Sequence, residues 1–306
     1  MDNLQVTINN YLEFCQLQKR LDSKTIKAYK IDLKQFTTET SLTNISEITP
    51  HILEKYIETL HINHKPKTVK RKIASLKAFF KYLEYKDYIE TNPFNKIQIK
   101  FREPIILPKT IPLHILEKLL STIYKEYSNA KTNYQKRKTL CDIAIIELLF
   151  ATGMRISELC SLKSENIDLI DRNILIYGKG SKERHIHIGN QDVYEILNKY
   201  YNEYQSEISQ CNFFFVNQSS KPITDQYVRR MIRKYCALAS IDLHITPHMF
   251  RHTFATSLLE ADVDIRYIQE MLGHSSINIT QIYTHVAISK QVDILTTKHP
   301  RKNFNI

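Results

Sequence analysis

Apolar residues recur at the spacing of amphipathic helices through most of this 306-residue chain, and a proline-containing stretch interrupts the pattern between the first and second thirds. The stretch runs from about Asn92 to Pro112 and contains further prolines, which break helical periodicity. Stretches of this kind commonly connect two separately packed domains. We therefore predict an N-terminal domain at residues 1–98, a linker at residues 99–112 and a second domain at residues 113–306.

Four amphipathic helices are expected in the N-terminal domain. Ser23 is a suitable N-cap for the second helix, and Thr49 followed by Pro50 is a typical start for the third, because proline fits the first helical turn. The fourth helix is predicted from Thr68, with apolar residues along one face. These patterns predict a helical bundle.

The opposite face of the fourth helix, with its lead-in, is strongly basic. A run of like charge is most often a solvated helix face. Several basic residues together, beside Thr and Ser hydroxyls that can bond phosphate, also fit a helix that faces DNA. The predicted DNA-facing residues are Lys65, Lys67, Lys70, Arg71, Lys72, Lys77 and Lys81.

Both parts of the chain carry an excess of positive charge. The formal net charge is +11, from 43 Lys plus Arg against 32 Asp plus Glu. Such an excess favours a polyanionic partner, nucleic acid before membrane, although lysine-rich proteins are also common in AT-rich genomes. The five cysteines are scattered without C-x-x-C spacing, and no apolar run is long enough to span a bilayer. We expect reduced thiols and a cytoplasmic protein.

Near the middle of the second domain, the spacing of apolar residues changes from the helical period to the alternation of strands. Asn173–Tyr177 and Arg184–Ile188 read as two short strands of a hairpin, and Phe213–Val216 could add an edge strand. Helical patterns return from Thr224 and again from Thr246 followed by Pro247. The expected fold class is therefore mainly α, with a helical bundle followed by a mixed α+β domain that contains a small antiparallel sheet.

Four polar clusters lie in the second domain, and four of the five glycines of the chain stand within or beside them. Arg155 follows a glycine that should end a helix, and Lys179 sits at the tip of the predicted hairpin. His248 and Arg251 are three positions apart and share a helix face. His274 follows a second glycine that should end a helix. Glu158 is expected to support Arg155 or to cap its helix.

These residue types together indicate a site for a phosphate group. Two arginines can neutralise a phosphodiester and its more highly charged transition state, a role that metal ions play in other nucleases. The clusters contain no paired carboxylates, and no Asp/Glu cluster suggests a metal site. Phosphoryl transfer without a metal needs a nucleophile from the protein, and tyrosine is one candidate. Composition alone does not choose among 18 tyrosines.

The four clusters, in this order, resemble the signature of the tyrosine recombinase (integrase) family, and are most similar to the compact Xer-type enzymes. The likeness covers nearly the whole chain, and residues 1–98 resemble the SAM-like core-binding domain of that family. Four ordered clusters with matching intervals are a far more specific signal than one short motif. The resemblance rests on Arg155, Lys179, His248, Arg251, His274 and Tyr283.

The resemblance implies a division of roles in a phosphate site. Arg155 and Arg251 would clamp the non-bridging oxygens of the scissile phosphate, and His274 would donate a hydrogen bond to it. Asp262 stands where the family often has glycine, and aspartate tolerates left-handed backbone angles better than most residues.

The remaining residues would carry the covalent chemistry. Tyr283 would attack the phosphate, His248 would accept or relay its proton, and Lys179 would protonate the leaving 5′-oxygen. Because the reaction exchanges one phosphodiester for another, the resemblance implies neither cofactor nor ATP.

The resemblance also implies partners. Double-stranded DNA would be exchanged through a Holliday junction by a tetramer on paired sites, with the segment after Tyr283 docking on a neighbouring protomer. A partner recombinase or accessory protein is left open, as is the choice among dimer resolution, mobile-element integration or excision, and inversion. The competing interpretations are a type IB topoisomerase-like enzyme and a DNA-binding protein without recombination activity.

Overall fold

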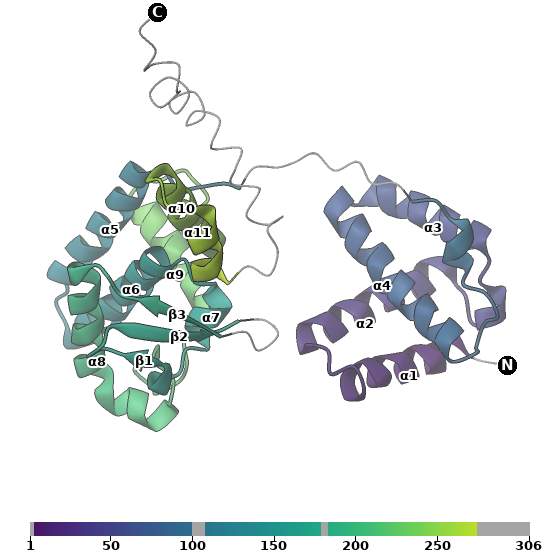
Figure 1. Ribbon diagram of the computed structural model, residues 1–306, viewed down its shortest axis with the longest axis horizontal. Coiled ribbons are helices and arrows are strands. Elements are labelled where there is room, and N and C mark those ends of the chain that lie inside the picture. The colour runs from purple at the N-terminus through teal and green to yellow at the C-terminus, as the bar shows by residue number, and fades with distance from the viewer. Residues whose placement is uncertain (1–2, 100–107, 179–182, 274–306) are drawn as a thin grey trace, which may run out of the picture. The chain divides into compact units, whose positions relative to one another are not determined.

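The computed structural model describes residues 3–99, 108–178 and 183–273, which divide into two units, Met1–Pro104 and Ile105–Ile306 (Figure 1). The division falls within the linker predicted at residues 99–112. Each unit is built around an apolar core of its own.

The described residues of the N-terminal unit form four α-helices, as predicted, and two short 3₁₀ segments. They are α1 (Leu4–Leu17), α2 (Ser23–Thr40), η1 (Ile45–Glu47), α3 (Pro50–Asn63), α4 (Pro66–Tyr85) and η2 (Pro93–Lys96). Thr49 caps α3 as predicted. Asp22, rather than Ser23, caps α2, because its Oδ1 accepts a hydrogen bond from the Lys24 amide at 2.8 Å. The start of α4 is Pro66, two residues before the predicted Thr68.

Aromatic side chains fill the core of this unit. Tyr11 of α1 lies 5.3 Å from Phe79 of α4, centroid to centroid, in a tilted arrangement. Phe80 lies edge-on to Phe94 of η2 at 5.3 Å. Since Phe94 is buried, the segment around it packs with the N-terminal unit, and the start of the proline-containing stretch forms η2 rather than part of the linker. Pro93 stands at the first position of η2, where proline fits, and Phe94 provides the packing.

A buried polar network joins α2 to α4. Asp32 is 1% exposed and accepts hydrogen bonds from Ser75 Oγ at 2.7 Å and Lys72 Nζ at 3.2 Å, as well as from Arg71. Lys72 also bonds Gln35 and is 4% exposed. The prediction that Lys72 lies on the exposed basic face is therefore wrong. Its position on α4 falls among apolar positions, and Asp32 supplies the charge that allows its burial.

Replacing Asp32 with alanine is expected to destabilise the N-terminal unit by about 3–5 kcal/mol, because it leaves the Lys72 ammonium buried without its carboxylate. Native-state hydrogen exchange of the α4 amides in the full chain would measure this loss. The matched control is Asp22→Ala, which removes only a helix cap and should cost about 1 kcal/mol. Equal losses for the two variants would contradict the importance of the buried pair.

The C-terminal unit is mainly helical around a small sheet, as predicted. Its described elements are α5 (Leu113–Ser128), α6 (Asn133–Thr152), α7 (Ile156–Cys160), η3 (Ser164–Asn166), β1 (Ile167–Asp168), β2 (Asn173–Tyr177), β3 (Glu183–His187), α8 (Gln191–Cys211), α9 (Asp225–Leu238), α10 (Pro247–Glu260) and α11 (Ile265–Leu272).

Helix α6 is the central element of this unit, and α5, α8 and α10 pack against it (Figure 1). Every residue from Thr139 to Ile146 is buried, which explains why apolar residues occur on all sides of this segment, while the buried Asp142 accepts hydrogen bonds from Tyr227 and Tyr235 of α9. The α8 helix is absent from the sequence-based prediction. Its buried residues Val193, Leu197 and Tyr200 nevertheless follow helical spacing.

The sheet has the strand order β1-β2-β3 and is antiparallel among the described residues. The predicted hairpin is confirmed, with Ile174 opposite Ile186 and Ile176 opposite Arg184. The predicted edge strand at Phe213–Val216 is wrong: its ends form isolated bridges, and β1 occupies the edge instead.

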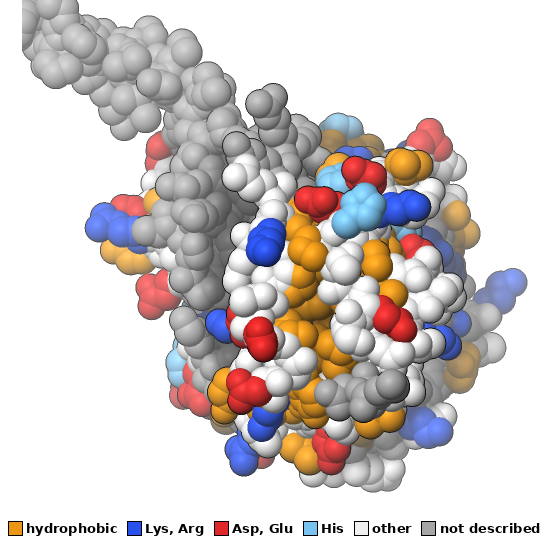
Figure 2. Space-filling view, turned by 90° about the vertical axis from the view of Figure 1, so that its right-hand side faces the viewer, with side chains coloured by type: hydrophobic (Ala, Val, Ile, Leu, Met, Phe, Trp, Pro, Cys, Tyr) orange, Lys and Arg blue, Asp and Glu red, His pale blue; other side chains and the backbone are white. Residues whose placement is uncertain are grey.

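Charge on the molecular surface is mixed where Figure 2 displays it. On that face, Lys and Arg side chains lie singly among acidic and polar groups, and apolar side chains form a band between them. Within residues 3–99, 108–178 and 183–273, each helix is too short or too polar to cross a membrane.

Candidate active site

A left-handed glycine ends α6 at a point where its backbone lies close to α10. Gly153 has a φ of +58°, and its amide donates to the Leu149 carbonyl, which confirms the predicted helix end. A Cβ at this position would lie 2.5 Å from Cδ1 of Phe254 on α10. Glycine is therefore needed both for the backbone angle and for the close approach of the two helices. Arg155 follows two residues later, at the N-cap of α7.

Glu158 anchors Arg155 at two points, as predicted. Its Oε2 accepts from the Arg155 amide at 2.8 Å, and its Oε1 accepts from Arg155 Nη1 at 2.7 Å. The Arg155 side chain remains 31% exposed. The guanidinium is therefore oriented by the protein and still accessible to a ligand.

Arg251 connects the ends of two helices. Its Nη1 donates to the Gly153 carbonyl at 2.9 Å and its Nη2 to the Leu272 carbonyl at 2.6 Å. The residue is 4% exposed. Carbonyl groups at helix C-termini carry partial negative charge, so they are suitable acceptors for a buried cation. The forked guanidinium fits two separated carbonyls, which a single ammonium does not.

His248 lies one turn before Arg251 on α10, as predicted, and its ring is electrostatically influenced by both arginines. Partial removal of water from the ring, followed by the positive charges of Arg229, Arg251 and Arg155, lowers the pKa of His248 below its ordinary 6.5. The imidazole is therefore neutral at neutral pH and can accept a proton. Three of the six predicted catalytic residues thus lie in one cationic site.

The two histidines of α10 are expected to titrate below their ordinary value. Burial, then the charges of His248 and Arg251, lowers the pKa of His252 from 6.5 to about 4. Because the folded-state pKa values are the lower ones, the stability contributed by neutral His248 and His252 is present above pH 6.5 and is lost as pH falls through the folded values. NMR titration of the histidine ring resonances, assigned with the variants His248→Gln and His252→Gln, would measure both pKa values. A pKa of His248 at or above 6.5 would contradict the lowering that the surrounding arginines are expected to cause.

The other three predicted catalytic residues, Lys179, His274 and Tyr283, lie outside the described residues. The structure does describe the elements next to two of them. Strands β2 and β3 flank the segment that contains Lys179. Gly273 ends α11 with a φ of +64°, as predicted, and directly precedes His274.

Asp262, in the turn before α11, also has a left-handed backbone. Its φ is +67°. This is the left-handed conformation, which aspartate tolerates better than most residues, so the departure predicted from the sequence is accommodated.

Arg184 belongs to the same site and was missed from the sequence. Its Nη2 donates to Glu158 Oε2 at 2.6 Å, and its Nε donates to the Met271 carbonyl at 2.8 Å. A signal was present: Arg184 shares the alternation of Ile186 and Ile188, so it points to the buried face of the strand.

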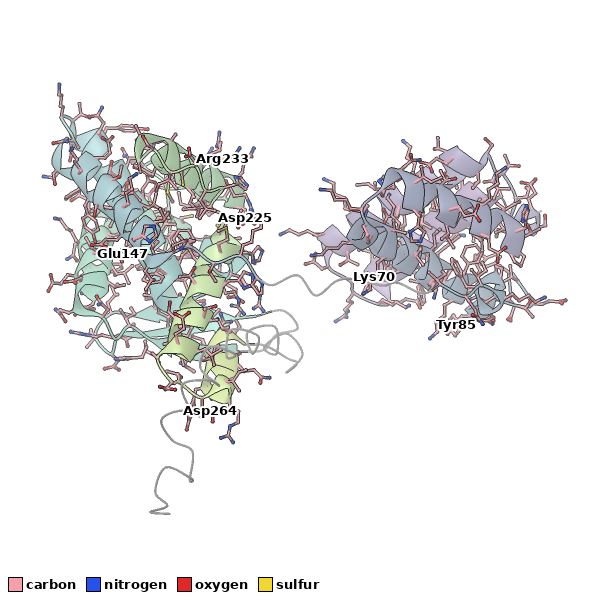
Figure 3. The ribbon with its side chains drawn as sticks, turned by 90° about the horizontal axis from the view of Figure 1, so that it is seen from above. Lys70, Tyr85, Glu147, Asp225, Arg233 and Asp264 are labelled. Atoms are coloured by element: carbon pink, nitrogen blue, oxygen red, sulfur yellow. The ribbon has the colours of Figure 1, made fainter. Side chains whose placement is uncertain are left out.

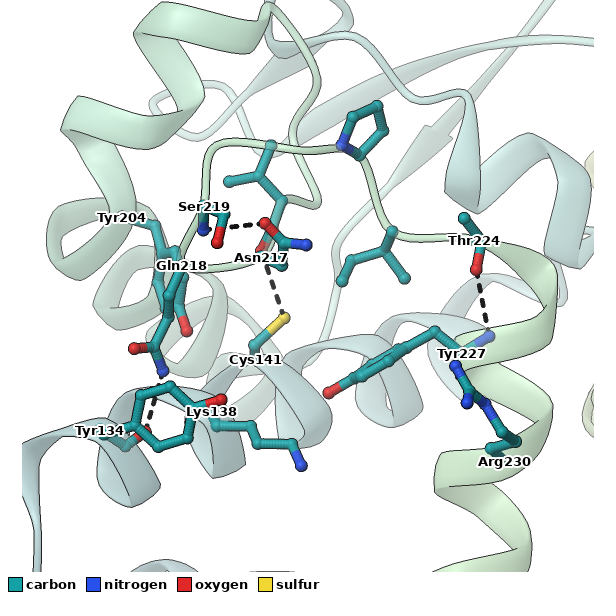
Figure 4. Close-up of a pocket in the computed structure, with 13 residues that line it drawn as sticks. Tyr134, Lys138, Cys141, Tyr204, Asn217, Gln218, Ser219, Thr224, Tyr227 and Arg230 are labelled. Atoms are coloured by element: carbon teal, nitrogen blue, oxygen red, sulfur yellow. Dashed lines mark hydrogen bonds between the residues drawn. The ribbon is translucent and has the colours of Figure 1, made fainter.

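The site does not coincide with the cavity in Figure 4, which has a volume of about 350 Å³. That cavity lies between α6, α8, α9 and the loop at residues 217–223, and its lining includes Lys138, Cys141, Tyr227 and Arg230. Arg155, His248 and Arg251 are not among the lining residues. Among the described side chains, no group of three or more His, Cys, Asp or Glu is arranged to hold a metal ion.

Comparisons with known proteins assign the family. The phage integrase family matches residues 115–290, and its N-terminal SAM-like domain matches residues 8–86. A tyrosine recombinase of Agathobacter rectalis is 70% identical over 100% of both chains. Tyrosine recombinase XerC of Bacillus pumilus is 33% identical over 98% of each chain. The solved structure of XerH site-specific recombinase is similar in fold, with a TM-score of 0.74 and 23% identity over 93% of this chain and 83% of that one. The chain therefore belongs to the phage integrase family and is a tyrosine recombinase.

Proposed function

We propose that this recombinase cuts and rejoins duplex DNA through a covalent bond between Tyr283 and a 3′-phosphate. The observation that carries the proposal is the convergence of Arg155, Arg251 and neutral His248. Two guanidinium groups supply charge for a phosphate, and a neutral imidazole beside them can take a proton from an attacking hydroxyl.

The proposed reaction is an exchange of phosphodiester bonds. The Tyr283 oxygen attacks the scissile phosphorus as its proton passes to or through His248. The bond between phosphorus and the 5′-oxygen breaks, and Lys179 protonates that oxygen. Arg155, Arg251 and His274 stabilise the charge on the non-bridging oxygens. Rejoining reverses each step, so the number of phosphodiester bonds is conserved and no nucleotide cofactor is consumed.

Duplex DNA is the proposed partner of both units. On α4 and its lead-in, Lys65, Lys67, Lys70, Lys77 and Lys81 are exposed, and we assign them to phosphate contacts together with Arg71, which is partly exposed (Figure 3). Lys72 is removed from this set because it is buried.

The C-terminal unit offers a second basic surface on α9. Its exposed face carries Arg229, Arg230 and Arg233, and Arg229 is close enough to His248 to lower its pKa (Figure 3). Phosphates beside the scissile one would therefore meet further positive charge. The similar XerH structure is a post-cleavage complex with its difH substrate.

Assembly is proposed to follow the pattern implied by the family resemblance. Four protomers would pair two sites and exchange strands in sequence through a Holliday junction in the cytoplasm. A partner recombinase or an accessory protein is compatible with the same chemistry.

Covalent trapping tests this function. The purified chain would be mixed with nicked suicide duplexes drawn from its own replicon and separated on a denaturing gel. The expected result is a protein–DNA adduct in which peptide mapping places the nucleotide on Tyr283. DNA binding without an adduct would support a binding protein that lacks recombination activity. Relaxation of supercoiled plasmid without any recombination site would support a type IB topoisomerase-like enzyme.

A further inference from the structure

One carboxylate lies between two guanidinium groups in the candidate active site. Glu158 Oε1 accepts from Arg155 Nη1 at 2.7 Å and from Arg184 Nη1 at 3.2 Å. Its Oε2 accepts from the Arg155 amide at 2.8 Å and from Arg184 Nη2 at 2.6 Å. The two bonds from Arg155 lie within the first turn of α7, whereas the two from Arg184 join β3 to α7, and β1 and β2 lie between these elements in the chain.

This arrangement leaves one positive charge in excess, and the excess is accessible at Arg155. The Arg184 side chain is 7% exposed, whereas that of Arg155 is 31% exposed. Burial alone would raise the pKa of Glu158, but the hydrogen bonds from Arg184 and from the Arg155 amide lower it overall. The carboxylate is therefore charged at neutral pH, and it needs a buried cation to balance it.

Arg184 is held in place from two further sides. Its Nε donates to the Met271 carbonyl in the last turn of α11 at 2.8 Å. A Cβ added to Gly273 would lie 3.1 Å from Arg184 Cδ and 3.2 Å from Nη1, so the arginine packs directly against this glycine. Three separate nitrogens of one plane thus each donate to a different acceptor, a geometry that the guanidinium provides and the single nitrogen of an ammonium does not.

We propose that Arg184 is a positioning residue for strand cleavage, which neutralises Glu158 so that the positive charge of Arg155 remains available to the scissile phosphate. The inference rests on the proposed role of Arg155 in binding that phosphate. Without Arg184, Arg155 becomes the cation that balances the buried carboxylate. Its charge is then cancelled within the protein, and less of it acts on the phosphate.

The test is a double-mutant cycle on single-turnover cleavage of a nicked suicide duplex that carries the site recovered by covalent trapping. Arg184→Met is expected to slow cleavage by about 10- to 100-fold, the range found for groups that orient and tune a reacting centre. Its affinity for the duplex should change by less than about threefold, because the residue is buried. The decisive variant combines Arg184→Met with Glu158→Gln.

Neutral glutamine at position 158 removes the charge that Arg184 balances while retaining an oxygen for the Arg155 amide. The double variant should therefore cleave at least about tenfold faster than Arg184→Met alone, a difference of about 1.4 kcal/mol in activation free energy. A role confined to packing predicts the opposite order, because the double variant loses more native contacts. A double variant no faster than Arg184→Met, or an Arg184→Met protein that cleaves like the wild type, overturns the proposal.

Arg137→Met is the matched control for removal of a partly buried, paired arginine. Arg137 of α6 pairs with Glu203 and Glu207 of α8 and is 19% exposed. It should lower stability and leave the cleavage rate of the folded protein within about threefold of wild type.

If Arg184→Met does not fold, the double variant is compared with Glu158→Gln alone: rates within about threefold support the proposal, and a larger loss overturns it. Failure of the wild type itself to form an adduct would count against the proposed function instead.

Discussion

Tyr283→Phe is expected to abolish the covalent protein–DNA adduct and to lower the cleavage rate by at least about 10⁴-fold, the scale of losing a nucleophile in other covalent enzymes. Phenylalanine keeps the ring and removes the hydroxyl that forms the bond to phosphorus. Binding of the intact duplex should remain within about threefold, because one hydroxyl contributes little beside the phosphate contacts. Gel separation under denaturing conditions measures the adduct, and a gel shift measures binding.

Tyr267→Phe is the matched control for this substitution. Tyr267 lies on α11 and is 63% exposed, so it is the kind of accessible tyrosine that could be mistaken for the nucleophile. It should form the adduct at the wild-type rate. An adduct that survived in Tyr283→Phe and disappeared in Tyr267→Phe would mean that the interval after His274 had pointed to the wrong residue.

Arg251→Lys is expected to have the second largest effect, a loss of about 10²- to 10³-fold in single-turnover cleavage. The lysine keeps the charge, but its ammonium cannot reach the Gly153 and Leu272 carbonyls together, which Arg251 bonds at 2.9 and 2.6 Å. One buried carbonyl would then lose its donor, at a cost of about 1–3 kcal/mol in stability. The variant would lose the two-pronged guanidinium geometry that fits a phosphate, and it would also lose the hydrogen bonds by which Arg251 joins the ends of α6 and α11.

The control for Arg251→Lys is Arg229→Lys, which changes an exposed arginine near the same histidine. It should reduce cleavage by less than about tenfold, since a solvated lysine can still neutralise a phosphate. Thermal unfolding of both variants separates loss of structure from loss of chemistry. An Arg251→Lys enzyme within tenfold of wild type would show that the guanidinium geometry is unimportant for cleavage.

Helix boundaries were predictable because the forces that set them are local. Thr49, Thr246 and Gly153 act on their own turn of chain through a cap hydroxyl, a following proline or a left-handed backbone angle. The hairpin of β2 and β3 was equally local, since its strands are adjacent in sequence. The cluster residues were predicted from their types and intervals along the chain, and three of them, Lys179, His274 and Tyr283, lie outside the described residues.

Contacts between distant segments could not be predicted in this way. Lys72 was assigned to the basic face of α4, whereas it pairs with Asp32 of α2, 40 positions earlier, and is buried. The Phe213–Val216 segment has strand-like composition, but the sheet edge beside β2 is occupied by β1. In each case the position of the segment is set by a residue or strand that is distant in the sequence and that only the folded chain brings into contact.

The amino-acid sequence by itself determined the two-domain helical architecture, the family and the identity of the candidate catalytic residues, because periodicity, caps and ordered intervals are properties of the chain. Only the tertiary structure decided how the charges of the site are balanced. Glu158 is shared between Arg155 and Arg184, and Arg251 bonds the ends of α6 and α11. The physical reason is that a buried charge is stable only beside its partner, and these partners come together only when α6, α7, β3, α10 and α11 have packed.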